Sequence, residues 1–385
     1  MAEWKHVKIG DVCTVERGGS PRPIDKFITD DPNGINWIKI GDTTDSMYIT
    51  ETAQKIIPEG MKKSRYVQPG DFLLSNSMSF GRPYILKIDG CIHDGWLVLR
   101  DNDGIFDKRF LYYYLSSPST YQKFKNMAVG GVVNNLNSEM VRGVTVPVPP
   151  MDEQIDIVTT LDKVTELIAL RKEQLAKLDQ LVKSRFIELF GDPVYNNNGL
   201  PTKKLCELGS LDRGRSQHRP RNDPKLLNGP YPLIQTGEVA SAGLYITEYK
   251  NTYSELGLQQ SKMWKAGTLC ITIAANIAQT AILTFDACFP DSVVGFVPND
   301  AVSAIYMHYW FGFFQKILEE QAPQVAQKNI NLKILSDLDV MVPKKEHQEQ
   351  FAAFVEQTDK SKLAIQQSLD KLELLKKSLM QRYFG

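Results

Sequence analysis

The sequence predicts an α+β protein in which two similar β-rich domains are each followed by a long helix. Three observations predict this class. The chain repeats itself at an offset of about half its length, the repeat ends in two long segments with coiled-coil spacing, and the preceding segments contain short apolar runs between turn signals. A length of 385 residues also fits two domains.

The internal repeat is clearest at the end of each half. Residues 175–191 share eight identities with residues 369–385 at an ungapped offset of 194, and Val148-Pro149 matches Val342-Pro343 at the same offset. Earlier matches are sparser, as with Arg17-Gly18 and Arg213-Gly214. The two halves are therefore expected to share one fold and to differ in their surface residues.

The repeat divides the chain into four segments. We expect a β-rich domain at 1–150, a helical region at 151–191, a second β-rich domain at 192–343 and a second helical region at 344–385. The expected strands of both domains lie at 37–40, 71–74, 84–88, 96–99, 271–273 and 281–285, and the expected shorter helices at 108–115, 118–127 and 306–320.

Residues 152–190 and 346–384 are expected to be long helices, with Asp152 as the N-cap of the first and Gly191 as its stop. Their apolar residues alternate at spacings of four and three, as in a coiled-coil seam. The seam consists of Ile157, Leu161, Val164, Ile168, Leu175, Leu178, Val182 and Leu189 in the first helix and Phe351, Val355, Ile365, Leu369, Leu372, Leu379 and Tyr383 in the second. Arg171, Arg185, Thr358, Lys362 and Lys376 interrupt it.

Each helix could instead pack on its own domain as ordinary core. A helix of about 39 residues runs ~58 Å, however, which is longer than a domain of ~140 residues is wide. We therefore expect the two helices to pair as an antiparallel coiled coil with pseudo-two-fold symmetry. Two domains carried on such a rod would suit two DNA half-sites about one helical turn, ~34–36 Å, apart. Because the domains differ in sequence, the half-sites should differ too.

Composition places limits on the type of protein. Five scattered cysteines without a CxxC pair argue against a disulfide framework or a structural zinc site, and favour a reducing cytoplasm. We expect no membrane span, because no run of about 18 apolar residues occurs. The 45 basic residues are balanced by 45 acidic ones, which counts against a purely electrostatic binder of nucleic acid.

The entries to the two long helices resemble a known family. Val146–Gln154 follows the pattern V-P-V-P-P-x-x-E-Q, Val340–Gln348 is a second version, and Ser184–Pro193 reads S-R-F-x-E-L-F-G-D-P. These motifs, with a long helix after each entry, resemble the specificity subunit of type I restriction-modification enzymes. The resemblance covers the whole chain, although His347 departs from Glu153 at the second entry.

The resemblance implies two target-recognition domains that read a bipartite, asymmetric site in double-stranded DNA. It also implies two methyltransferase subunits docked on the helices, and restriction or translocase subunits in the same complex. S-adenosylmethionine, ATP and magnesium would then belong to those partners, and this chain would hold no cofactor or metal. The alternatives are a coiled-coil scaffold whose β-domains bind protein, and an enzyme with an unfamiliar motif.

The motif search favours a chain without a catalytic site. No amino-methyltransferase N-P-P-[YF] or D-P-P-[YF] motif, no F-x-G-x-G and no G-x-x-x-x-G-K-[ST] phosphate loop occurs, and the five histidines are isolated. Asp94 and Asp291 recur at matched positions, and we expect each to hydrogen-bond a turn. Cys91 and Cys288 are expected to be core thiols.

Candidate DNA contacts lie in matched polar loops, because arginine suits phosphate and guanine whereas asparagine and glutamine suit adenine. They are Arg17, Ser20, Arg22, Asn76, Ser77, Arg82, Asn134 and Asn135 in the first domain, and Arg213, Arg215, His218, Arg219, Arg221, Asn276, Gln279, Gln327, Lys328 and Asn329 in the second. A solvated basic loop or an ordinary turn is the alternative at each place.

Overall fold

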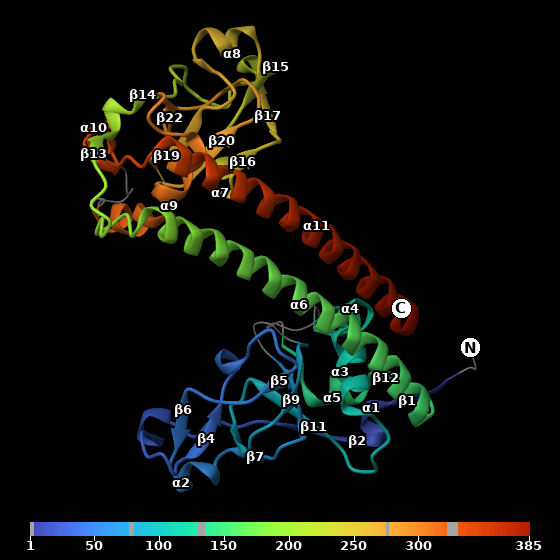
Figure 1. Cartoon of the computed structure of the whole chain (residues 1–385). Helices are drawn as coiled ribbons and strands as arrows, with labels where there is room; N and C mark the ends of the chain where they lie inside the picture. Colours follow the sequence, from blue (N-terminus) through green and yellow to red (C-terminus); the bar gives the residue numbers. More distant parts are fainter. Residues whose placement is uncertain (1–3, 77–80, 129–134, 275–276, 322–329) are drawn as a thin grey trace. The chain divides into compact units, whose positions relative to one another are not determined.

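The computed structural model describes residues 4–76, 81–128, 135–274, 277–321 and 330–385, and Figure 1 shows its elements. The chain forms two compact units. Unit 1 consists of residues 1–172 and 367–385, and unit 2 of residues 173–366. Among the described helices, none combines the length and the apolar character that a bilayer-spanning segment needs.

Unit 1 contains two mixed five-stranded sheets. The first has the order β2 (Cys13–Arg17), β11 (Trp96–Asp101), β8 (Phe72–Ser75), β9 (Pro83–Leu86) and β5 (Tyr48–Ile49). The second has the order β3 (Ile28–Thr29), β6 (Gln54–Ile56), β4 (Ile35–Ile38), β10 (Gly90–Ile92) and β7 (Arg65–Val67). A short ribbon pairs β1 (Lys5–Lys8) with β12 (Thr145–Val148), and the short helices are α1 (Ile9–Val12), α2 (Pro58–Met61), α3 (Lys108–Ser116), α4 (Pro118–Ala128) and α5 (Ser138–Arg142).

Unit 2 repeats this topology, except that among the described residues its second sheet has four strands and no counterpart of β3. Its first sheet has the order β14 (Gly209–Arg213), β22 (Val293–Pro298), β19 (Leu269–Thr272), β20 (Thr280–Leu283) and β16 (Tyr245–Ile246). Its second sheet has the order β17 (Asn251–Tyr253), β15 (Leu227–Leu233), β21 (Ala287–Cys288) and β18 (Met263–Trp264), and β13 (Thr202–Lys204) pairs with β23 (Asp339–Met341). The helices are α7 (Thr236–Ser241), α8 (Glu255–Gln259), α9 (Ala304–Gln321) and α10 (Leu332–Ser336).

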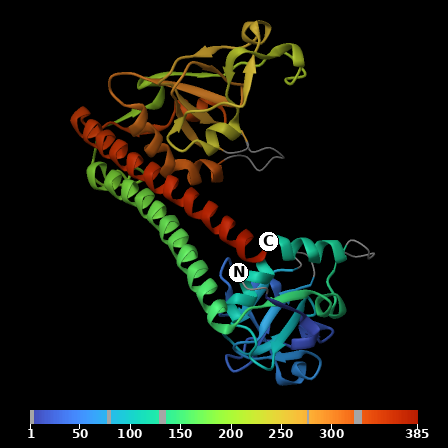
Figure 2. The ribbon, with the colours of Figure 1, turned by 90° about the vertical axis from the view of Figure 1, so that its right-hand side faces the viewer.

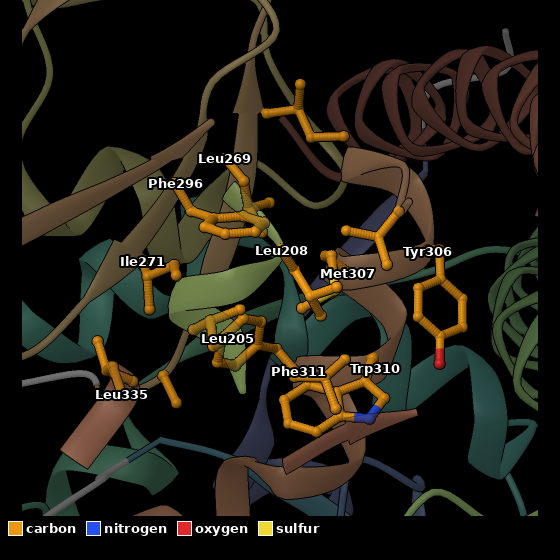
Figure 3. Packing of buried hydrophobic residues seen from close by; sticks show 14 of the residues in the cluster. Leu205, Leu208, Leu269, Ile271, Phe296, Tyr306, Met307, Trp310, Phe311 and Leu335 are labelled. Carbon is orange, nitrogen blue, oxygen red and sulfur yellow. The ribbon is translucent and has the colours of Figure 1, made fainter. Parts of the chain in front are cut away.

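The first sheet of each unit is buried on both faces. Because side chains alternate along a strand, Phe72 and Leu74 of β8 belong to the core cluster that includes α3. Leu73 points to the other face and belongs to the cluster between the first and second sheets. This is why the middle strands are continuous apolar runs. In unit 2, Leu269, Ile271 and Phe296 pack toward Met307 and Phe311 of α9, as Figure 3 shows.

The two long helices are α6 (Met151–Phe190) and α11 (Lys345–Phe384), and both views of the ribbon show them unbroken (Figure 2). Their predicted extents are confirmed within one residue. Gly191 has a left-handed φ of +82°, which fits the predicted stop. The N-cap prediction was wrong: α6 begins at Met151, so Asp152 lies inside the first turn, where its charge complements the helix dipole.

Within each unit the two helices run antiparallel. In unit 1, Lys172 pairs with Glu373 at 3.2 Å, while Leu161 shares a core with Met380 and Phe384. In unit 2, Asp179 pairs with Lys362 at 2.6 Å. The predicted seam residues that are buried are Ile157, Leu161, Val164, Ile168, Val182, Phe351, Val355 and Leu369, and those that are half-buried are Leu175, Leu178, Leu189, Ile365, Leu372, Leu379 and Tyr383.

The C-terminal end of each long helix completes the core of the β-domain from the other half of the sequence. Phe384 of α11 packs edge-on against Phe110 and Tyr114 of α3, with ring centroids 5.5 and 5.9 Å apart. Phe190 of α6 occupies the matching place in unit 2, where it lies 5.1 Å from Tyr306. The strong match at these residues in the repeat therefore has a packing reason.

A buried glutamine fixes the start of each long helix. Gln154 is 1% exposed; its amide donates to the carbonyl oxygens of Ile105 and Pro149 at 3.0 Å, and its carbonyl accepts from the Asp107 backbone N–H at 2.9 Å. Gln348 makes the same three bonds with Ala301, Pro343 and Ser303. In both glutamines the side-chain amide nitrogen and the side-chain carbonyl oxygen are therefore hydrogen-bonded, which explains why glutamine recurs in both entry motifs.

The Phe384→Ala variant is expected to destabilise unit 1, because it opens a cavity among Phe110, Tyr114 and Met380. The free energy of unfolding of this unit should fall by about 3 kcal/mol. Amide hydrogen exchange of α3 should accelerate while that of α9 stays unchanged. Leu374→Ala is the control, since that side chain is 68% exposed; equal effects of both changes would contradict the packing role.

His308 of α9 should make unit 2 sensitive to acid. Burial lowers its pKa to about 4, against a hydrogen bond with Thr280 that acts to raise it, and Lys362 lowers it further. Since the folded pKa lies below the ordinary 6.5, protons bind preferentially to the unfolded chain. Stability should be full above pH 6.5 and fall by about 3 kcal/mol as the pH drops toward 4. Denaturant titrations between pH 7.5 and 5 should show a weaker decline for His308→Gln; an identical decline would refute this assignment.

Candidate nucleic-acid interface

One arginine-rich loop in each unit leaves the edge strand of the first sheet. In unit 1 the loop follows Arg17 at the end of β2, and in unit 2 it follows Arg213 at the end of β14. The next residue in both is a glycine that passes close to backbone: a Cβ on Gly18 would lie 2.2 Å from the His93 carbonyl oxygen, and one on Gly214 would lie 2.2 Å from that of Phe289. The repeated Arg-Gly pair thus reflects a close crossing that only glycine permits.

Asp94 organises the loop of unit 1. Its carboxylate accepts from Ser20 Oγ at 2.9 Å and from Arg22 Nη2 at 3.1 Å, and its backbone carbonyl accepts from Arg17 Nε at 3.1 Å and Asn76 Nδ2 at 3.0 Å. Burial acts to raise the pKa of Asp94, but the Ser20 hydrogen bond and the charges around it hold that pKa below its usual value. The carboxylate is therefore ionised and oriented.

Asp291 has the same place in unit 2. Arg221 Nη2 lies 2.7 Å from its Oδ1, and Arg219 Nη2 lies 3.7 Å from its Oδ2. Arg219 also donates through Nη1 to the backbone carbonyls of Ser216 and His218, so it ties the loop to itself. Both aspartates were predicted to hydrogen-bond a turn; the structure shows each carboxylate bonded to side chains of the arginine-rich loop of its own unit.

A second segment that the sequence did not single out supports the loop of unit 2. Gln260 Oε1 accepts from the backbone N–H groups of Gln217 and His218, at 2.7 and 3.0 Å, and Ser261 Oγ donates to the Arg215 carbonyl at 3.0 Å. These residues lie about 45 positions from the loop, and their own neighbours carry no motif. Sequence reasoning therefore had no signal for them.

The predicted contact residues differ in accessibility. The exposed ones are Arg17, Arg22, Arg82, Asn135, Arg213, Arg215, His218, Arg219 and Arg221. Ser20 and Gln279 are half-buried. Ser77, Asn134, Asn276, Gln327, Lys328 and Asn329 lie outside the described residues.

Asn76 does not fit a direct contact with DNA. Its side chain is 2% exposed, and its amide nitrogen is held by the Asp94 carbonyl. The residue closes the first sheet at the end of β8 and supports the turn that carries Asp94. The pattern of a polar residue after a strand could not distinguish these two roles.

A cavity of about 340 Å³ lies beside Arg221 in unit 2. Its lining residues include Asn222, Gln235 and Asn251, whose side chains carry amide donors and acceptors. The surface around Arg221 is therefore rich in neutral hydrogen-bonding groups as well as charge.

The described residues contain no group of three or more His, Cys, Asp or Glu side chains that could hold a metal ion. Cys91 and Cys288 are both fully buried, as predicted for core thiols, and burial raises the pKa of each. Neither thiol is poised as a nucleophile.

Comparisons with known proteins agree with this organisation. A family model described as "Type I restriction modification DNA specificity domain" matches residues 1–180 and 198–374. A putative type I restriction enzyme MjaX specificity subunit of Methanocaldococcus jannaschii is 22% identical, over 98% of this chain and 92% of the relative. The type I restriction enzyme EcoBI specificity subunit of Escherichia coli is 21% identical, over 99% of this chain and 85% of the relative.

Two solved structures share the fold. One comes from work on complex assembly and conformational transition of the type I R-M system; it has a TM-score of 0.64 at 18% identity and matches 100% of this chain and 98% of its own. The other, the type I restriction-modification system S subunit from M. genitalium, has a TM-score of 0.57 at 13% identity, over 100% and 96% of the two chains.

Proposed function

The chain belongs to the family of type I restriction-modification DNA specificity domains, and from this membership we propose that it selects the DNA sequence on which a type I complex acts. The observation that carries the proposal is the pair of arginine loops. Each leaves the matching edge strand of its own unit, β2 or β14, and each is bonded to a matched aspartate, but the two loops differ in sequence. One unit therefore reads one half-site, and the target is bipartite and asymmetric.

We propose that the chemistry lies in partner subunits. Two methyltransferase subunits would bind S-adenosylmethionine and methylate adenine, and restriction or translocase subunits would use ATP and magnesium. Exposed apolar side chains on the long helices support docking there, among them Leu181, Leu363 and Leu374, which are 49%, 61% and 68% exposed. This chain would then act as a non-catalytic subunit.

DNA-binding measurements separate this function from a scaffold that binds only protein. Electrophoretic binding should be sequence-selective for the full chain assembled with its methyltransferase partner, and weaker for the chain alone, because its own charge is balanced. Absence of DNA binding in both states would overturn the proposal and favour the scaffold.

Exchange of residues 200–343 for the matching segment of a relative should change only one half of the methylated site. The reason is that the arginine loop, Asp291 and the supporting Gln260 all lie within that segment. Methylated positions in DNA modified by the assembled complex provide the readout. The reciprocal exchange of residues 1–150 is the control; a change of both half-sites in either exchange would refute modular reading.

Removal of one heptad from each long helix, residues 170–176 and 364–370, should shorten the unread spacer. Seven helical residues correspond to about 10 Å, or roughly three base pairs. The seam stays in register because its period is conserved. The same methylation assay should show unchanged half-sites and a shorter spacer; an unchanged spacer would reject the helices as the element that sets it.

A further inference from the structure

We infer that Arg22 and Arg221 are the base-reading arginines of the two units. One edge of the Arg22 guanidinium is held by Asp94, and one edge of the Arg221 guanidinium by Asp291, while the opposite edge of each binds a guanine. This inference rests on the proposed DNA-specificity function and assigns the chemistry of its two contacts. Nothing in the family match distinguishes these arginines from the other exposed arginines of the same loops.

Among the described residues, each guanidinium is bonded along one edge only. Arg22 contacts Asp94 through Nη2 at 3.1 Å, and its side chain is 81% exposed. Arg221 contacts Asp291 through Nη2 at 2.7 Å and is 48% exposed. A guanidinium carries five N–H donors in a planar fork, so a carboxylate at one nitrogen leaves a pair of donors directed to solvent.

Charge then selects the ligand of that free pair. The Arg22–Asp94 pair is neutral, and at Asp291 the carboxylate offsets the charge of Arg221, the nearer of its two arginines, at 2.7 Å against 3.7 Å for Arg219. A guanidinium whose charge is offset in this way gains less from a phosphate and releases less of the counterion atmosphere. It still presents two parallel donors to neutral acceptors. Guanine offers O6 and N7 as two adjacent acceptors in the major groove, whereas adenine replaces one of them with a donor.

The carboxylates are themselves held in place, which is what a positioning residue needs. Asp94 accepts from Ser20 at 2.9 Å and lies 3.1 Å from His93 Nε2. Asp291 is flanked by Arg219, which is bound to its own loop through Nη1. An oriented carboxylate restricts the arginine rotamers before DNA arrives and so lowers the entropy lost on binding.

The same loop of unit 2 provides matched controls. Arg213 and Arg215 are exposed, and neither forms an ion pair within the part of the chain that the structure describes. Arg215 acts on Asp212 through its charge alone, without an ion-pair contact, so both side chains remain available to phosphate. The two pairs of arginines should therefore have different roles in DNA binding. Arg22 and Arg221 determine base preference, whereas Arg213 and Arg215 determine how affinity depends on salt.

The test is selection of bound sequences from random duplex DNA by the full chain assembled with its methyltransferase subunits, followed by affinity measurements at several salt concentrations. The wild-type complex should select a guanine in each half-site. Arg22→Gln should remove the preference at one guanine and Arg221→Gln at the other, each by about 5- to 150-fold, with little change in the salt slope. Arg22→Lys and Arg221→Lys should lose the same preference, because lysine lacks the fork.

Substitutions at the controls and the carboxylates distinguish the roles. Arg213→Gln and Arg215→Gln should keep the selected bases and each reduce the salt slope by about 0.9. Asp94→Asn and Asp291→Asn should weaken the guanine preference and steepen the salt slope, because the freed guanidinium then binds phosphate. A purely structural aspartate would leave both properties of the folded complex unchanged, and that result would overturn the positioning role.

Three further outcomes would overturn the inference. Retention of both guanines in the Arg22 and Arg221 variants would show that other groups read them. A reduced salt slope without any change of selected bases would make these arginines phosphate contacts. If the wild-type complex selects no sequence at all, the proposed function fails, and the inference fails with it.

Discussion

The burial of each long helix's aromatic end in the core of the other half's β-domain is the interaction on which both units depend. Phe384 fills the space beside Phe110 and Tyr114, and Phe190 fills the space beside Tyr306 and Phe351. Full burial of such a ring contributes about 2–3 kcal/mol. Neither β-domain has a complete core without a helix end that belongs to the other repeat.

This exchange determines how the helices pair. A helix that begins at one β-domain and ends in the core of the other must run antiparallel to its repeat, which makes the opposite connection. The glutamines at the helix starts fix the other end, since Gln154 and Gln348 bind the carbonyls and N–H groups of the preceding loops. The seam between these two anchors tolerates polar positions: Lys362 pairs with both Asp179 and Asp359 there, at 2.6 and 3.6 Å. Such polar layers reduce stability and favour one register.

The sequence predicted the fold more completely than the site because the two depend on different kinds of contact. Helix extents and the buried middle strands follow from periodicity, which is local, and the matching of Cys91 and Asp94 with Cys288 and Asp291 follows from the repeat. Burial of Asn76 and the support from Gln260 depend on which distant segments meet, and no local pattern encodes that. Asp152 was predicted as the N-cap, but α6 begins one residue earlier, at Met151; a sequence pattern places a helix boundary only to within one or two residues.

The balance of charge in the chain is also found locally, in the two arginine-rich loops. A protein that bound DNA through phosphate contacts alone would need an excess of unpaired basic residues. Arg22 and Arg221 instead each form an ion pair with an aspartate of the same unit. Pairing lowers affinity for DNA in general, because non-specific binding comes almost wholly from counterion release. It does not lower discrimination, since the free donors still distinguish base edges. Ion-paired arginines of this kind suit a subunit that selects the DNA site while its partner subunits provide most of the non-specific affinity for DNA.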